Sequence, residues 1–238
     1  MRNWCTPIVS KGAALGCAAG LAIAFCVHAA PPQRVEIAYE VAHNGTAVAE
    51  VSDRLEHDGR SYRLTETWHG KGVYALGGEA VRSSRGAVVT DGLRPLEFED
   101  RRSGRDTARA NFDWKAKSLT LQYKGAPETR PLPAGAHDRL SFLYGFAFSQ
   151  PGAQAVTYNV ADGKGVSRYV YRAAGRERVK TPAGEFDSLK IVKQKEKPQD
   201  RGTEIWLAAD RHYLPVRIVV VEKDGTRLDQ VAVRISAQ

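Results

Sequence analysis

Apolar and polar residues alternate along most of the chain after residue 34. Val35, Ile37, Tyr39 and Val41 are separated by polar or small neighbours, and a period of two is typical of a β-strand with one buried face. Further strands are predicted at 61–68, 73–76, 87–90, 108–114, 118–123, 155–161, 168–173, 189–195, 203–208, 216–222 and 228–235. The pattern therefore predicts a mainly β protein.

Five dipeptides of one type punctuate the chain between these segments. They are Asn44-Gly45, Asp58-Gly59, Asp91-Gly92, Asp162-Gly163 and Asp224-Gly225. Such dipeptides readily supply the positive φ angles that two-residue hairpin turns require. Successive hairpins favour a meander, so we expect a single curved antiparallel sheet, an incomplete barrel.

Segment 137–149 departs from this pattern. Leu140, Leu143, Tyr144 and Ala147 have helical spacing, and Asp138 is a suitable residue to cap a helix. The aromatic residues of the segment also alternate as they would in a strand: Phe142, Tyr144, Phe146 and Phe148. We expect a short helix near 138–147, with a strand as the alternative.

The N-terminus has the three parts of a secretory signal peptide. Arg2 and Lys11 precede an apolar run at 13–27, and small residues follow at Ala29 and Ala30. A transmembrane anchor is the alternative, but a stable span needs about 20 apolar residues. We expect cleavage after Ala29, so that 1–29 is a signal peptide and 30–238 is a single periplasmic domain with no remaining transmembrane span.

All three cysteines, Cys5, Cys17 and Cys26, precede that cleavage site. Lipidation at Cys17 or Cys26 is a weaker alternative, because Ala14 and Phe25 do not fit the pattern around a lipid-modified cysteine. The mature domain is therefore expected to have no disulfide bond, although disulfides form readily outside the cytoplasm.

The net charge bears on the choice of partner. The formal charge of +8 becomes +6 when Arg2 and Lys11 are removed. Acidic surfaces of a bacterial envelope, such as lipid head groups, are possible partners, and nucleic acid is not expected there. A basic, soluble surface without a dedicated partner is the alternative.

The sequence contains no recognisable catalytic or metal-binding motif. No serine lies in a G-x-S-x-G sequence, and the histidines after residue 30 lack the spacing of a metal site. We therefore predict no cofactor, no metal and no catalytic residue. A hydrolase remains an alternative, because carboxylates distant in sequence can meet across a sheet. Glu97, Glu99 and Asp100, beside Arg101 and Arg102, are expected to form solvated ion pairs.

Two groups of residues are candidates for ligand binding. Lys193, Lys195 and Lys197 fall on one face of a predicted strand. The basic residues just before it, on adjoining strands, are Arg168, Arg172, Arg176, Arg178 and Lys180. Such a basic face could hold phosphate groups, or it could protect a sheet edge from aggregation. The aromatic residues Phe142, Tyr144, Phe146 and Phe148, with Trp206, could line a cavity for an acyl chain or form ordinary core.

Several motifs in order resemble the DUF3108 family of exported proteobacterial proteins. They are 83–86 with 91–95, the string DRLS at 138–141, TPAGEF at 181–186 and EIWLAADRHYLPVRI at 204–218. The family label implies no activity. The stretch from Trp206 to Arg217, with the hairpin that follows, is also similar to lipoprotein carriers of the LolA type. This weaker likeness implies a curved, incomplete barrel around an apolar cavity with a helical lid.

The leading hypothesis is a non-enzymatic periplasmic carrier that binds an apolar or lipid-like envelope molecule. Its candidate ligand-binding residues are Phe142, Tyr144, Phe146, Trp206, Arg217, Lys193 and Lys195. An envelope scaffold or interaction protein is the alternative, and a hydrolase without a recognisable motif is the third.

Overall fold

The computed structural model describes residues 31–149, 151–152 and 154–238. The predicted signal peptide and its cleavage site after Ala29 lie outside these residues. The strands are β1 (Arg34–His43), β2 (Thr46–His57), β3 (Ser61–Gly70), β4 (Ala80–Val89), β5 (Gly92–Arg102), β6 (Ala108–Asp113), β7 (Ser118–Gln122), β8 (Glu128–Pro131), β9 (Ala136–Asp138), β10 (Val156–Ala161), β11 (Val166–Thr181), β12 (Gly184–Lys193), β13 (Gly202–Ala208), β14 (Leu214–Val221) and β15 (Arg227–Ala237). The helices are α1 (Ser141–Gly145) and two 3₁₀ segments, η1 (Gly72–Gly77) and η2 (Ala209–Arg211).

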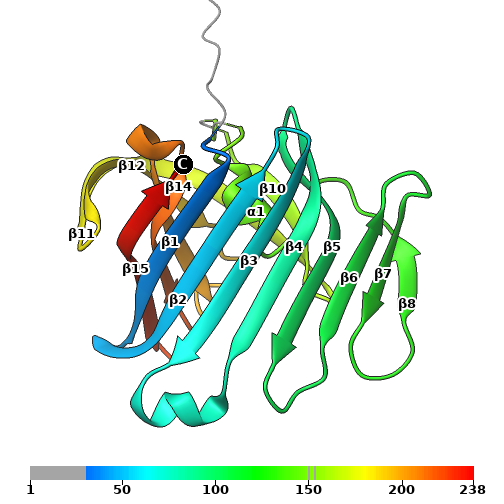
Figure 1. Ribbon diagram of the computed structural model, residues 1–238, viewed down its shortest axis with the longest axis horizontal. Coiled ribbons are helices and arrows are strands. Elements are labelled where there is room, and N and C mark those ends of the chain that lie inside the picture. The colour runs from blue at the N-terminus through cyan, green and yellow to red at the C-terminus, as the bar shows by residue number, and fades with distance from the viewer. Residues whose placement is uncertain (1–30, 150, 153) are drawn as a thin grey trace, which may run out of the picture.

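All fifteen strands belong to one sheet, in the order β8-β7-β6-β5-β4-β3-β2-β1-β15-β14-β13-β12-β11-β10-β9. Neighbouring strands are antiparallel except β9 and β10, which are parallel. The sheet is curved, and α1 lies within the curve, where it contacts β5, β9 and β14 (Figure 1). Strands β8 and β9 form the two edges, so the barrel is incomplete, as predicted.

The alternation in β1 explains how one face of the sheet becomes the core. Val35, Ile37, Tyr39 and Val41 are each at most 2% exposed, whereas the residues between them are half-buried or exposed. The glycines of all five predicted turns have positive φ angles, which confirms the turns: Gly45, Gly59, Gly92, Gly163 and Gly225.

Two of the predicted strands are wrong in whole or in part. Segment 73–76 forms η1 instead, because Gly72 and Gly78 both adopt positive φ angles and turn the chain. Its apolar side chains, Val73 and Leu76 among them, are exposed. The strand predicted at 189–195 ends at Lys193, and the loop after it turns where the Lys197 N–H donates to the Asp200 carboxylate.

The predicted short helix is confirmed, although α1 is shorter than 138–147. The Asp138 carboxylate accepts hydrogen bonds of 2.8 Å from the backbone N–H groups of Leu140 and Ser141. The Ser141 hydroxyl accepts a 2.9 Å hydrogen bond from the Asp138 N–H. These reciprocal bonds turn the chain into α1, so Asp138 acts from two positions before the N-cap residue, Leu140, rather than at the cap position itself. None of the helices in the described ranges is long and apolar enough to span a bilayer.

Candidate ligand-binding site

An aromatic cluster fills the space between α1 and the strands β10 and β11. The Phe142 ring lies 5.8 Å from Tyr158, 6.1 Å from Tyr169 and 5.8 Å from Tyr171, measured between centroids. Phe146 contacts Tyr158 at 5.9 Å. Edge-to-face and offset contacts at these distances stabilise buried aromatic groups. The cluster therefore fixes α1 against β10 and β11.

A pocket of about 440 Å³ opens beside this cluster, where β12 ends and β11 begins. Tyr169 belongs to both, because it contacts Phe142 and also lines the pocket. Lys193 is paired with Tyr171 in the sheet, so it points to the same face as the cluster. The lining residues are Ser167, Arg168, Tyr169, Val170, Lys193, Gln194, Lys195, Glu196, Asp200, Arg201 and Lys223. We call this cavity the rim pocket.

The rim pocket has more basic than acidic side chains. The ammonium group of Lys193 lies 4.1 Å from the centroid of the Tyr169 ring, within the range of a cation–π interaction. Arg201 forms an ion pair with Glu222 at 3.1 Å. Arg168, Lys193 and Lys195 form no ion pair with any other residue that the structure describes. These three cations are therefore available to an anionic ligand.

Burial raises the pKa values of two tyrosine hydroxyl groups in the aromatic cluster beside the pocket. It raises the pKa of Tyr158 to about 12. It also raises the pKa of Tyr171, although a hydrogen bond to Thr203 and the charge of Arg201 act in the opposite direction. Both phenols are neutral at physiological pH, so the aromatic side of the pocket carries no negative charge that would oppose an anion.

Trp206 and Arg217 lie together, but on the opposite face of the sheet from α1. Tyr39, which points toward α1, is paired with Ala232, whereas Arg217 is paired with the next residue, Val231. The Arg217 guanidinium lies 5.2 Å from the Trp206 centroid. It also donates to Asp229 at 2.9 and 2.6 Å. The structure thus separates these two predicted site residues from the aromatic cluster and the rim pocket.

The remaining predicted site residues divide between two neighbouring places. Phe142, Tyr144 and Phe146 are 9%, 1% and 4% exposed, so all three are buried in the core within the curve of the sheet. Trp206 is also buried, but on the other face. Lys193 and Lys195 line the rim pocket. A ligand-binding role for any of these residues stays a prediction.

The structure also contains a buried row of charged side chains that the sequence analysis missed. Asp53, Glu66, Arg82 and Asp100 lie opposite one another on β2, β3, β4 and β5. Arg82 forms ion pairs with Glu66 and Asp100. Asp53, at 2% exposed, lies in the core, where burial, together with the neighbouring charge of Glu66, raises its pKa well above the usual range.

This buried row shows that one expectation about Asp100 was wrong. The sequence also contains a pattern from which the row could have been predicted. Asp100 is 6% exposed, so it is not in a solvated ion pair as predicted. Glu97 and Glu99 do form ion pairs that are partly or largely exposed. Asp53 and Glu66 occupy positions at which strand alternation requires an apolar residue, between Val51 and Leu55 and between Leu64 and Trp68. Charged residues at such positions indicate a buried polar interaction.

A second buried polar group surrounds the start of α1. The Ser84 hydroxyl donates to Asp138 Oδ2 at 2.6 Å and lies 2.9 Å from the Tyr62 hydroxyl. Burial raises the pKa of Asp138 to about 6 despite these hydrogen bonds. Burial lowers the pKa of the adjacent His137 to about 4. The Ser141 hydroxyl is buried, is hydrogen-bonded to the backbone N–H and carbonyl groups of Asp138, and lies 3.4 Å from His137 Nδ1. These residues therefore form a structural anchor rather than an exposed nucleophile.

Comparison with known proteins gives a family and a fold. A family model described as "Protein of unknown function (DUF3108)" matches residues 35–231. No match was found among curated proteins. Among solved structures, the chain is similar to the "Beta-barrel-like Protein of Domain of Unknown Function DUF1849" from Brucella abortus. That match has a TM-score of 0.59 at 8% identity and covers 87% of this chain and 99% of the other.

Two further solved structures match at lower TM-scores and support no argument about the fold. One is a "putative lipoprotein" from Parabacteroides distasonis, with a TM-score of 0.38, 12% identity and coverage of 86% and 97%. The other is a "putative exported protein with YmcC-like fold" from Bacteroides fragilis, with a TM-score of 0.36, 10% identity and coverage of 87% and 100%.

Proposed function

Because the chain belongs to the DUF3108 family, whose description assigns no activity, we propose a function from the site itself. The protein is a non-enzymatic periplasmic binding or carrier protein for an anionic, lipid-like envelope molecule. The acidic head group binds in the rim pocket, and the apolar part lies along Tyr169 toward Phe142.

The observation that supports this proposal is the position of Tyr169 between two kinds of surface. On one side, Lys193, Arg168 and Lys195 offer donors for charge-assisted hydrogen bonds to an acidic group. On the other side, Tyr169 contacts Phe142, which at 9% is the most exposed of the aromatic residues in α1. A polar head and an apolar chain in one molecule match this change of chemistry between the two sides of Tyr169.

The location is part of the same proposal. Residues 1–29 are a signal peptide that is removed after Ala29, and 30–238 form one domain in the periplasm. N-terminal sequencing of the protein from a periplasmic extract should return Ala30. A sequence that begins at Met1, or a lipid-modified Cys17 or Cys26, would contradict this.

Native mass spectrometry of protein purified from the periplasm tests for the ligand directly. A fluorescent fatty acid is then titrated against the wild type and three variants. Lys193→Met and Phe142→Ala should each weaken saturable probe binding, whereas Lys197→Met, in the same loop region but outside the pocket lining, should not. If the wild type shows no saturable binding and no bound mass, the carrier proposal is wrong.

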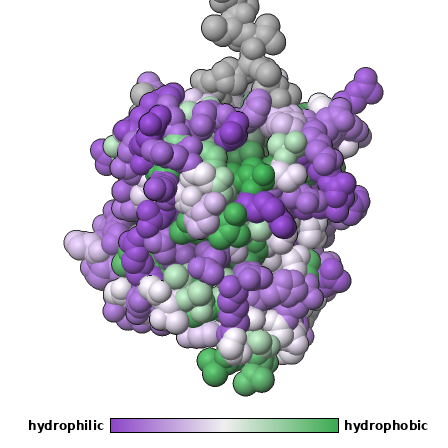
Figure 2. Space-filling view, turned by 60° about the vertical axis from the view of Figure 1, so that its left-hand side comes forward, coloured by the Kyte–Doolittle hydropathy of each residue, from purple (hydrophilic) through white to green (hydrophobic). Residues whose placement is uncertain are grey.

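A second candidate function is supported by the apolar tip of η1. Val73 and Leu76 are 77% and 91% exposed, and Figure 2 shows apolar surface at the lower end of the molecule, where Figure 1 places η1. Exposed apolar side chains on an ordered loop are typical of interaction surfaces. Photo-crosslinking from position 76 in intact cells should capture one defined envelope protein if this candidate is correct, and scattered products if it is not.

A further inference from the structure

A row of charged side chains crosses the outer face of the sheet, opposite the face that holds α1. In the sheet register, Arg34 on β1 faces Glu56 on β2, Glu56 faces Arg63 on β3, Arg63 faces Arg85 on β4, and Arg85 faces Glu97 on β5. The signs of the charges alternate except at one place. Arg63 and Arg85 are two cations directly opposite each other, an arrangement that destabilises a sheet.

The ion pairs around this place leave Arg63 without a carboxylate. Glu56 binds Arg54 on its own strand at 2.5 Å. Arg85 directs Nε and Nη2 to Glu97, which leaves its Nη1 unoccupied by that pair. Arg63 itself forms no ion pair with any residue in the described part of the chain. The donors of Arg63, with one nitrogen of Arg85, are therefore available to an anion.

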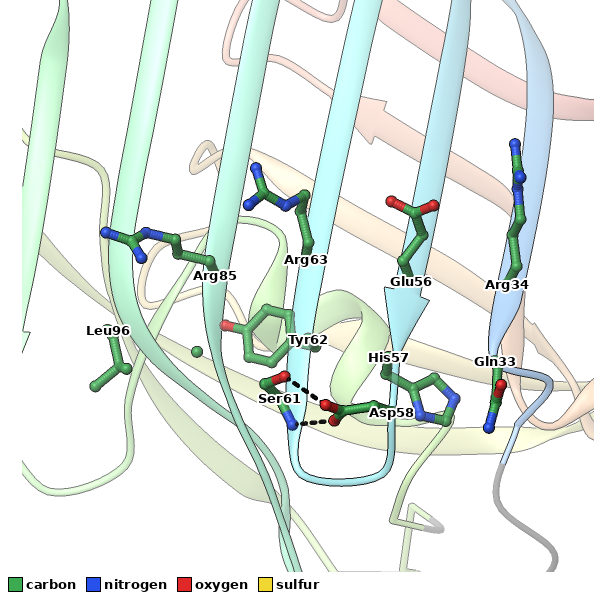
Figure 3. Close-up of a pocket in the computed structure, with 11 residues that line it drawn as sticks. Gln33, Arg34, Glu56, His57, Asp58, Ser61, Tyr62, Arg63, Arg85 and Leu96 are labelled. Atoms are coloured by element: carbon green, nitrogen blue, oxygen red, sulfur yellow. Dashed lines mark hydrogen bonds between the residues drawn. The ribbon is translucent and has the colours of Figure 1, made fainter.

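These two arginines border a hollow of about 580 Å³. Figure 3 shows the Arg63 side chain between Glu56 and Arg85, with its guanidinium group inclined toward Arg85. Gly86 also lines the hollow, and a side chain there would collide with the backbone of Arg94 and with the Tyr62 ring. The hollow also contains Leu96, which is 46% exposed at the residue where the pairing of β4 and β5 shifts.

We propose that this outer hollow is a second binding site, which takes a phosphate group between Arg63 and Arg85. A phosphate offers more acceptor oxygens than a carboxylate and can accept from guanidinium groups on two neighbouring strands at once. Its negative charge removes the repulsion that the sheet register imposes on the two cations. Leu96 provides an apolar contact for the remainder of a phosphorylated ligand. The site lies on the opposite face from the rim pocket and does not depend on it.

Calorimetric titration of the mature protein with inorganic phosphate and with dihexanoylphosphatidic acid tests this site. Arg63→Ala should weaken binding of either probe about tenfold or more. In the absence of a probe, the same substitution should leave the melting temperature unchanged or raise it, because it removes one of two facing cations. Arg101→Ala is the control, since Arg101 is on β5 outside the hollow and is 62% exposed at its side chain. Because the rim pocket is itself proposed to bind acidic head groups, both titrations are repeated in the Lys193→Met variant, where Arg63→Ala should weaken the remaining binding to the same extent.

The two probes distinguish the source of the phosphate. Equal affinities would assign the site to free phosphate, and tighter binding of the lipid that Leu96→Ser removes would assign it to a lipid head group. Either result supports the site. Unchanged affinity in Arg63→Ala, or no saturable binding of either probe to the wild type, would overturn it, whatever the outcome at the rim pocket.

Discussion

The hydroxyl group of Tyr144 donates a hydrogen bond of 2.7 Å to Asp53, and this bond joins α1 to β2 across 91 positions of sequence. Both residues are buried. The Tyr39 hydroxyl, 3.4 Å from that of Tyr144, donates to the carbonyl oxygen of Pro215. Three strands and the helix therefore meet at one chain of hydroxyl groups within the core.

Tyr144→Phe should destabilise the protein by about 1–3 kcal/mol, because it leaves the buried Asp53 carboxyl group without its donor. Urea unfolding at neutral pH measures the loss. Tyr74→Phe is the matched control: Tyr74 is 52% exposed on η1, and its hydroxyl should contribute almost nothing. Equal effects of the two substitutions would show that the bond to Asp53 does not stabilise the fold.

His137 and Asp138 should make the free energy of unfolding change with pH in opposite directions. The pKa of Asp138 is raised to about 6 in the folded state. Its contribution to the free energy of unfolding is therefore complete below its unfolded pKa and is lost as the pH rises toward 6. The pKa of His137 is lowered to about 4, so its contribution is present above its unfolded pKa and is lost as the pH falls toward 4. Between about pH 4 and 6 the two contributions nearly cancel.

His137→Gln removes one side of this balance. Relative to the wild type, its free energy of unfolding should fall by about 1.4 kcal/mol for each unit of pH rise between 4 and 6. Asp138→Asn should show the opposite slope, and the double variant should parallel the wild type. Urea unfolding at pH 4, 5 and 6 supplies the data, and parallel profiles for both single variants would contradict the assignment.

Gly86→Ala should destabilise the sheet strongly. The added Cβ would lie 2.1 Å from the Arg94 carbonyl oxygen and 2.9 Å from the Tyr62 ring, so β4 and β5 would have to separate locally. Gly165→Ala is the control, because no atom lies within 4 Å of its Cβ position and its φ is not in the positive region. Thermal melts should place the control close to the wild type; a comparable melting temperature for Gly86→Ala would be inconsistent with this packing.

Phe142→Ala should cost about 3–5 kcal/mol of stability, since it opens a cavity among Tyr158, Tyr169 and Tyr171. Leu76→Ala should change stability by less than about 0.5 kcal/mol, because Leu76 is 91% exposed. Denaturant melts compare the two. A loss much smaller than this for Phe142, combined with weaker probe binding, would mean that its ring serves the ligand more than the core.

Local signals were sufficient to predict the turns and most of the strands, because period-two alternation and Asn-Gly or Asp-Gly turns act within a few residues. No strand was predicted at β2, β5, β8 or β9. The pairing of β1 with β15 has no such signal. Segment 73–76 was misassigned because four residues are too few to establish a period of two. Gly72, at the start of η1, and Gly78, just after its end, turn the chain instead.

The candidate site was predictable in part. Arg168 and Lys193 were expected on adjoining strands and do line one pocket. The contribution of Tyr169 was not foreseen, because it depends on where α1 rests. Trp206 could not be assigned to a face from sequence, since Ile205, Trp206 and Leu207 are all apolar and all buried, so alternation is lost in β13.

The pairing of β1 with β15 also determines when the fold can be completed. Most strands on either side of this pair can form by successive local hairpins, but among the described strands the two halves of the sheet pair with each other only through β1 and β15. Until β15 has emerged from a ribosome or a translocation channel, β1 keeps an unpaired edge rich in β-branched and aromatic residues. The protein is therefore most vulnerable to aggregation just before its synthesis ends, and a chain cut short before β15 would lose the strand pairing that joins the two halves of the sheet.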